Sequence, residues 1–121
     1  MNDFDAELYP RFTSLKSQNG ALKVYISVGG WAAGGAVFSN MVGNTENRAT
    51  FIASAIQFMK TYGFDGIDID WEYPAAADRD GVAADTANFV TFLQELKAAC
   101  GGLYGITATL PSSYCKFSPS K

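Results

Sequence analysis

One stretch, residues 64–74, carries a pattern that few folds can accommodate. Successive side chains of a β-strand point to opposite faces, so this stretch would place three acids on one face: Asp68, Asp70 and Glu72. The other face would carry three large apolar side chains: Ile67, Ile69 and Trp71. The apolar face requires helices packed against it. The acidic face requires a polar cavity, because unpaired buried charges are costly.

A surface strand with an acidic, solvated face is the alternative interpretation of this alternation. Two features disfavour it: residues 64–74 contain no lysine or arginine, and aspartate is disfavoured in strands. Tyr73-Pro74 ends the strand and leaves Glu72 at its carboxyl end. Since active sites of α/β folds lie at that end, the acids are candidate catalytic groups.

The composition limits the chemistry that is available to this chain. It has 121 residues, a net charge of -3 and no histidine, which excludes histidine bases and histidine-ligated metals. The mild acidity predicts no nucleic-acid partner. No apolar run approaches the roughly 20 residues that span a membrane, and the acidic residues 1–5 do not resemble a signal peptide. The two cysteines, Cys100 and Cys115, could pair or stay free.

Hydrophobic periodicity predicts helices that alternate with strands. The expected order is helix 9–18, strand 22–28, loop 32–43, helix 45–62, the central strand, loop 75–84, a helix from 85 to about 100, and strand 104–110. Asn44 and Asp85 are the expected N-caps of the second and third helices. Gly63 and Gly101-Gly102 are the expected helix ends.

This order predicts an α/β fold with a parallel sheet. A doubly wound sheet and part of a TIM (β/α)8 barrel both fit it. We favour the barrel, because an acidic inward face suits a ring of strand ends better than a helix-covered sheet. A whole barrel needs about 250 residues. We therefore expect a fragment with about three parallel strands and their intervening helices.

Two motifs resemble those of the family 18 glycoside hydrolases, the chitinases. Residues 65–72, DGIDIDWE, match the family's Asp-x-x-Asp-x-Asp-x-Glu signature and precede Tyr73-Pro74, as is usual there. Residues 27–30, SVGG, match its Ser-x-Gly-Gly motif on the preceding strand and precede Trp31. The resemblance extends from about Tyr9 to Tyr114 and is strongest to fungal killer-toxin-type chitinases.

The resemblance implies a retaining, substrate-assisted mechanism. Glu72 would act first as general acid and then as general base. Asp70 would hold the N–H of the substrate's acetamido group, whose carbonyl attacks the anomeric carbon and forms an oxazolinium ion. Asp68 would share a proton with Asp70, and Ser27 would hydrogen-bond near Asp68. A catalytic carboxylic acid must hold its proton near neutral pH, which neighbouring carboxylates favour.

Further residues receive weaker assignments. Trp31, Tyr73 and Gly30 would contact the sugar, although ordinary packing is the alternative for Trp31. Asp65 would have a supporting, structural role. Spacing alone leaves open retaining or inverting chemistry, as well as Mg²⁺ or Ca²⁺ binding by the acids. The resemblance implies neither a metal nor another cofactor.

The resemblance also implies that parts of the family's site are missing. No counterparts occur for the first two strands, a later Met-x-Tyr-Asp strand or a tryptophan on the last strand. We expect a partial catalytic barrel over 1–114 and a divergent tail over 115–121, as in a truncated or mis-spliced reading frame. Exposed strand edges would permit self-association.

The expected substrate is chitin or a chito-oligosaccharide, and the location expected from the family is extracellular. The alternatives are a non-catalytic, lectin-like chitin-binding fragment and an endo-β-N-acetylglucosaminidase that acts on N-glycans. Non-catalytic relatives usually lose the acid glutamate, so the presence of Glu72 favours an enzyme.

Overall fold

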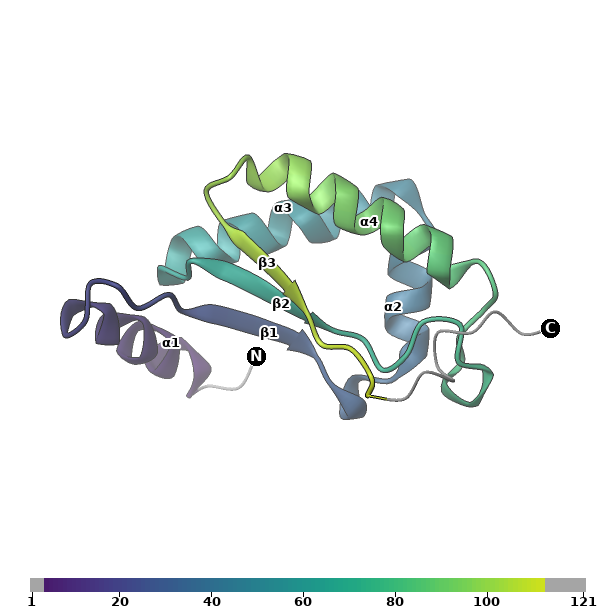
Figure 1. Ribbon diagram of the computed structural model, residues 1–121, viewed down its shortest axis with the longest axis horizontal. Helices are drawn as coiled ribbons and strands as arrows, with labels where there is room; N and C mark the ends of the chain where they lie inside the picture. The colour runs from purple at the N-terminus through teal and green to yellow at the C-terminus, as the bar shows by residue number, and fades with distance from the viewer. Residues whose placement is uncertain (1–3, 113–121) are drawn as a thin grey trace.

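The described part of the chain is an α/β structure built around a three-stranded sheet. The structure is a computed structural model that describes residues 4–112. Its main elements (Figure 1) are α1 (Asp5–Thr13), β1 (Tyr25–Gly29), α2 (Gly35–Val42), α3 (Thr45–Tyr62), β2 (Gly66–Asp70), α4 (Asp85–Cys100) and β3 (Gly105–Ala108). Short 3-10 helices span Ser14–Ser17, Trp31–Ala33 and Ala77–Arg79.

The sheet is parallel and has the strand order β1-β2-β3, which confirms the predicted three-stranded parallel arrangement. Its register aligns Ser27, Asp68 and Thr107 in one row across the strands. Two residues further along, Gly29 is aligned with Asp70. Polar groups from three separate segments of the sequence are therefore adjacent near the carboxyl end of the sheet.

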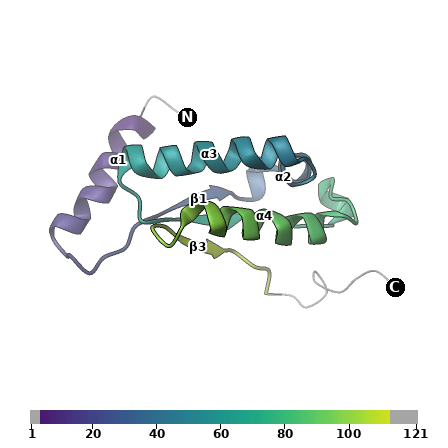
Figure 2. The same cartoon turned by 90° about the horizontal axis from the view of Figure 1, so that it is seen from above.

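Helices α3 and α4 lie side by side over one face of the sheet (Figures 1 and 2). The side chains of β2 on that face are Ile67 and Ile69, which are 1% and 0% exposed. Trp71 continues the face beyond the strand and stacks on Phe38 of α2, with ring centroids 5.5 Å apart. The buried core consists of Val24, Phe38, Val42, Ile52, Met59, Phe64, Ile67, Ile69, Trp71, Phe92, Leu96 and Cys100. The predicted apolar face is confirmed.

Local capping signals in the sequence explain where α3 and α4 begin and end. The Asn44 side chain accepts a hydrogen bond from the backbone N–H of Asn47 at 3.0 Å, so Asn44 is the predicted N-cap of α3. Gly63 ends α3 with φ +77°, and Gly101 ends α4 with φ +55°. Both glycines adopt the left-handed conformation that commonly terminates helices.

Residues 32–43 were predicted to be a loop, and this prediction is wrong because they contain α2. Phe38 and Val42 are one helical turn apart and are 5% and 0% exposed, so packing overrides the Gly/Ala-rich composition. Gly35 allows a close approach at the start of α2. A Cβ added there would lie 1.8 Å from the carbonyl oxygen of Arg79.

The predicted N-cap role of Asp85 is also wrong. Helix α4 begins at Asp85 and has Ala84 as its N-cap, without a side-chain cap. The fully buried Asp85 carboxylate instead accepts hydrogen bonds from Ser39 Oγ at 2.7 Å, the Val82 N–H at 2.8 Å and the Ala75 N–H at 3.2 Å. Asp85 therefore joins α2 to the loop that precedes α4.

The first helix begins earlier than the predicted range of 9–18. Helix α1 begins at Asp5, so Pro10 lies inside it and not in its first turn. Tyr9 anchors the helix through edge-on contacts, with centroids 5.2 to 5.8 Å from the rings of Phe58, Tyr62 and Phe64. This aromatic packing holds α1 against α3.

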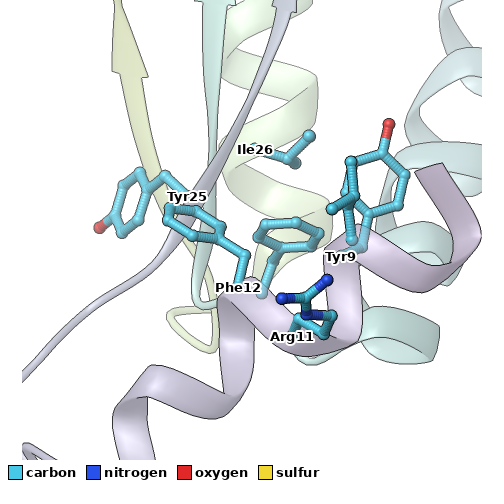
Figure 3. A pocket seen from close by; sticks show the side chains of 7 residues that line it. Tyr9, Arg11, Phe12, Tyr25 and Ile26 are labelled. Carbon is cyan, nitrogen blue, oxygen red and sulfur yellow. The ribbon is translucent and has the colours of Figure 1, made fainter. Parts of the chain in front are cut away.

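A hollow of about 580 Å³ lies between α1 and β1, and its lining includes none of Asp68, Asp70 and Glu72. In Figure 3, Tyr9, Arg11 and Phe12 of α1 lie beside Tyr25 and Ile26 of β1. Apolar side chains on and directly before α1 are also exposed; those of Phe4, Leu8 and Phe12 are 74%, 50% and 51% exposed. The outer side of β1 thus presents apolar surface to solvent.

We expect the isolated 121-residue chain to be marginally folded or to aggregate. In the described sheet β1 and β3 are both edge strands, and such edges promote association. Far-UV circular dichroism during heating, combined with light scattering, measures this behaviour. A sharp, cooperative melt of a soluble monomer would contradict the prediction.

Two sequence predictions fall wholly or partly outside the described residues. Cys100 is buried and forms no disulfide within residues 4–112, whereas Cys115 and the predicted tail 115–121 lie beyond the last described residue. Within residues 4–112, no helix is long and apolar enough to cross a membrane.

Candidate active site

Asp68 is the centre of a hydrogen-bond network that joins all three strands. Its carboxylate accepts hydrogen bonds from Ser27 Oγ at 2.9 Å, Thr107 Oγ1 at 2.7 Å and Thr109 Oγ1 at 3.1 Å. Burial opposes ionisation of Asp68, but these three hydroxyl donors outweigh it and hold the pKa below its ordinary value. The predicted hydrogen bond between Ser27 and Asp68 is present.

Asp70 lies in the opposite electrostatic environment. Burial raises its pKa, and the nearby carboxylates of Glu72 and Asp68 raise it further. Its buried Oδ1 atom has no hydrogen-bond partner among residues 4–112. The pKa values of two acids on one face of β2 are thus shifted in opposite directions, which favours a proton on Asp70 while Asp68 is ionised.

We expect Asp70→Asn to increase the resistance of the fold to denaturant at pH 7. A raised folded-state pKa means that ionised Asp70 destabilises the fold above that pKa, and that this penalty disappears as the pH falls through it. Asparagine removes the charge, so the gain should be largest at neutral pH and shrink toward pH 4. Urea titrations followed by circular dichroism measure the effect.

Asp65→Asn provides the matched control for this prediction. The pKa of Asp65 is lowered despite burial, because the Val24 N–H, Lys16 and Lys23 favour its charged form. The same substitution there should weaken the fold at neutral pH and have less effect as the pH falls. Equal changes in urea resistance for Asp70→Asn and Asp65→Asn would contradict the opposite pKa shifts that we assign to the two acids. A gain for Asp70→Asn that does not vary with pH would contradict them too.

Gly29, the last residue of β1, and Gly30, which follows it, allow the backbone to approach Asp70 closely. Gly29 and Gly30 have φ values of +121° and +85°. The Gly30 N–H donates a hydrogen bond to the carbonyl oxygen of Asp70 at 2.8 Å. A Cβ on Gly30 would lie 3.6 Å from Asp70 Oδ2, so Gly30 borders the carboxylate. Its predicted contact with a sugar stays a prediction.

Glu72 lies two residues beyond the end of β2. Its carbonyl oxygen accepts a hydrogen bond from Arg79 Nε at 3.2 Å. A hydrogen bond between the Tyr73 phenol and the Glu72 carboxylate is the main cause of the raised pKa of Tyr73, with burial and nearby charges adding to it. Tyr73 and Arg79 therefore contact the side chain and the backbone of Glu72, respectively.

Trp31 lies beside Arg79, in the short 3-10 helix that follows β1. Its side chain is 59% exposed, so it is not a core residue. The guanidinium carbon of Arg79 lies 3.8 Å from the centroid of the Trp31 ring. The contact of Trp31 with a sugar stays a prediction.

Asp65 lies at the amino end of β2, away from the other acids of the signature. It accepts a hydrogen bond from the Val24 N–H at 2.9 Å and forms ion pairs with Lys16 at 3.2 Å and Lys23 at 3.9 Å. These contacts hold the starts of β1 and β2 together and fit the supporting role that the sequence predicts.

Three residues of this site were not predicted: Thr107, Thr109 and Arg79. The alternation of Thr107 and Thr109 within the predicted strand 104–110 places both hydroxyls on one face. Alignment of that strand with the central one would have placed them beside Asp68. Arg79 gives no such signal, because it lies in an irregular loop.

The sequence matches the family described as "Glycosyl hydrolases family 18" over residues 1–119. The chain belongs to that family.

Among residues 4–112, no cluster of three or more acidic or cysteine side chains could hold a metal ion.

Individual relatives agree with this assignment. The chain is 43% identical to an endochitinase of Manduca sexta over 90% of its own length and 20% of that protein's length. It is 47% identical to a probable endochitinase of Caenorhabditis elegans over 88% of its length and 16% of the relative's. The chain thus spans a fifth or less of these curated relatives.

Solved structures show the same local fold. A Group IV chitinase of Ostrinia furnacalis in complex with allosamidin is 35% identical, with a TM-score of 0.90 over 98% of this chain and 32% of that chain. The three strands and their helices therefore match part of the fold of that chitinase, which confirms the predicted barrel fragment. These insect and nematode relatives do not test the narrower resemblance to fungal killer-toxin-type chitinases, which stays a prediction.

Proposed function

We propose that this chain carries the acid–base part of a chitinase active site, and that it hydrolyses β-1,4 linkages of N-acetylglucosamine polymers when the rest of the barrel is present. The observation that carries this proposal is the position of Asp70 between Asp68 and Glu72. Its buried Oδ1 atom has no hydrogen-bond partner among residues 4–112, and its pKa is raised. An unsatisfied buried acid is costly, so a substrate group that hydrogen-bonds to Asp70 would be bound favourably.

The proposed reaction begins with proton transfer from Glu72 to the glycosidic oxygen. The acetamido carbonyl oxygen of the sugar forms a bond to the anomeric carbon as the glycosidic bond breaks, which gives an oxazolinium ion. Asp70 passes its proton to Asp68, accepts a hydrogen bond from the acetamido N–H and, now ionised, stabilises the positive charge. Water then attacks the anomeric carbon and gives a proton to Glu72, so the β configuration is retained.

The substrate class rests on the relatives. One solved chitinase of Ostrinia furnacalis is in complex with allosamidin, and another is in complex with an oligomer of N-acetylglucosamine. Action on chitin or chito-oligosaccharides is therefore our proposal for this chain. An extracellular location, expected from the family, is a separate proposal. The domain limits of 1–114 and 115–121 likewise stay predictions.

The test is product release from a chito-oligosaccharide, measured for the chain alone and for a chimaera. The chimaera carries residues 9–112 in place of the matching segment of the Manduca sexta endochitinase. We expect turnover by the chimaera and little by the chain alone. A folded chimaera that binds the oligosaccharide without cleaving it would overturn the proposal in favour of a lectin-like role. Cleavage of N-glycans alone would favour the endo-β-N-acetylglucosaminidase alternative.

A further inference from the structure

Arg79 connects two segments that both contribute to the proposed site. It lies at the end of the 3-10 helix Ala77–Arg79, in the loop between β2 and α4. Its Nε donates to the carbonyl oxygen of Glu72 at 3.2 Å, and an Nη atom donates to the carbonyl oxygen of Trp31. One guanidinium group thus binds the backbone carbonyls of Glu72, the proposed acid, and of Trp31, the predicted sugar contact.

The same guanidinium also lies over the indole ring of Trp31, 3.8 Å from its centroid. This contact covers one face of a side chain that is otherwise mostly exposed. A planar cation can stack on a ring and donate two hydrogen bonds from its edge at the same time, whereas a lysine ammonium cannot reproduce this combination. The geometry therefore requires arginine and not only a positive charge.

The backbone that carries Arg79 is itself held in place. The fully buried Asp85 carboxylate binds the N–H groups of Ala75 and Val82, on either side of Arg79 in the sequence. On the side of α2, Gly35 lies so close to the Arg79 carbonyl that a Cβ would be 1.8 Å from its oxygen. The guanidinium thus projects from a loop that is fixed at both ends.

We propose that Arg79 is a positioning residue that sets the orientation of the Trp31 ring relative to Glu72 and thereby determines how a sugar chain is seated over the acids. This inference rests on the proposed function, because it assigns a role to Arg79 in seating the same substrate. Arg79 acts through Trp31 and Glu72 and need not touch the reacting atoms.

The test is a double-mutant cycle with Arg79→Lys and Trp31→Ala in the chimaera that carries residues 9–112 of this chain. We measure the affinity for a chito-oligosaccharide and check the fold by far-UV circular dichroism. Arg79→Lys should weaken binding about tenfold in the wild-type background, as expected for the loss of one stacked cation and one charge-assisted hydrogen bond. It should have little further effect when Trp31 is absent. Strictly additive effects would overturn the proposal.

Tryptophan fluorescence of the 121-residue chain, which has two tryptophans, reports the environment of Trp31 without depending on the proposed function. Trp71 is only 2% exposed, so acrylamide quenching reports mainly on Trp31. Arg79→Lys should increase quenching and shift the emission maximum, whereas Arg11→Lys, on exposed α1, should change neither. Unchanged fluorescence in Arg79→Lys would overturn the proposal.

Oligosaccharide binding and acrylamide quenching together distinguish the proposed function from the positioning role of Arg79. A wild-type chain and a chimaera that bind no chito-oligosaccharide would reject the proposed function, and the quenching result would still decide whether Arg79 orients Trp31. Binding by the wild type that is equal in Arg79→Lys would reject only the positioning role. If the far-UV circular dichroism of Arg79→Lys shows that this variant is unfolded, Arg79→Gln takes its place in the same cycle.

Discussion

Replacing Glu72 by glutamine should lower the rate of chito-oligosaccharide hydrolysis by about 10²- to 10⁴-fold, the usual contribution of a general acid–base group. Glutamine has nearly the same shape but cannot give a proton to the glycosidic oxygen or take one from water. Binding should remain, because Trp31 and Asp70 are unchanged. Initial rates and equilibrium binding, measured in the chimaera described above, test both parts of this prediction.

Glu46→Gln is the matched control, because Glu46 lies in the first turn of α3 and is not part of the proposed site. It should retain the rate of the parent. If Glu72→Gln hydrolyses the substrate as fast as the parent, Glu72 is not the acid. Loss of both binding and turnover would indicate that Glu72 holds the site together and would leave the acid role unsupported.

Replacing Gly29 by alanine should remove the folded state of the isolated chain. The new Cβ would lie 2.1 Å from the carbonyl oxygen of Asp70 and 2.9 Å from the Phe38 ring, at a residue with φ +121°. Overpacking and backbone strain each cost about 1–3 kcal/mol, so we expect a loss of roughly 3 kcal/mol or more. A marginally stable chain cannot tolerate that loss. Far-UV circular dichroism and limited proteolysis measure the folded fraction.

Gly20→Ala is the control for this second prediction, because a Cβ on Gly20 would have no atom within 4 Å. It should keep the circular dichroism and protease resistance of the parent. Gly29→Ala with the same folded fraction as Gly20→Ala would show that β1 and β2 can separate at this point. The close approach of the two strands would then not be required by the fold.

The parts of the fold that could be predicted are those that depend on local patterns. The alternation of Ile67 and Ile69 with Asp68 and Asp70 correctly predicts a strand with one buried and one polar face. Asn44 and Gly63 correctly delimit α3, because capping is decided by neighbouring residues. The two motifs correctly predict the family and the barrel.

The parts that could not be predicted depend on contacts between distant segments. Helix α2 forms because Phe38 packs on Trp71, which follows it by more than thirty residues in the sequence. Asp85 resembles an N-cap in the sequence, yet its carboxylate is used by the preceding loop and by Ser39 of α2. Arg79 becomes significant only once the loop brings it to Trp31. No local propensity contains this information.

The most direct test of the proposed mechanism is the anomeric configuration of the first-formed product. Proton nuclear magnetic resonance can follow hydrolysis of a chito-oligosaccharide by the chimaera before mutarotation obscures the result. Attack by the substrate's own acetamido group, followed by water from the opposite side, predicts that the β anomer forms first. An initial α anomer would mean direct displacement by water, and would contradict the roles proposed for Glu72 and Asp70.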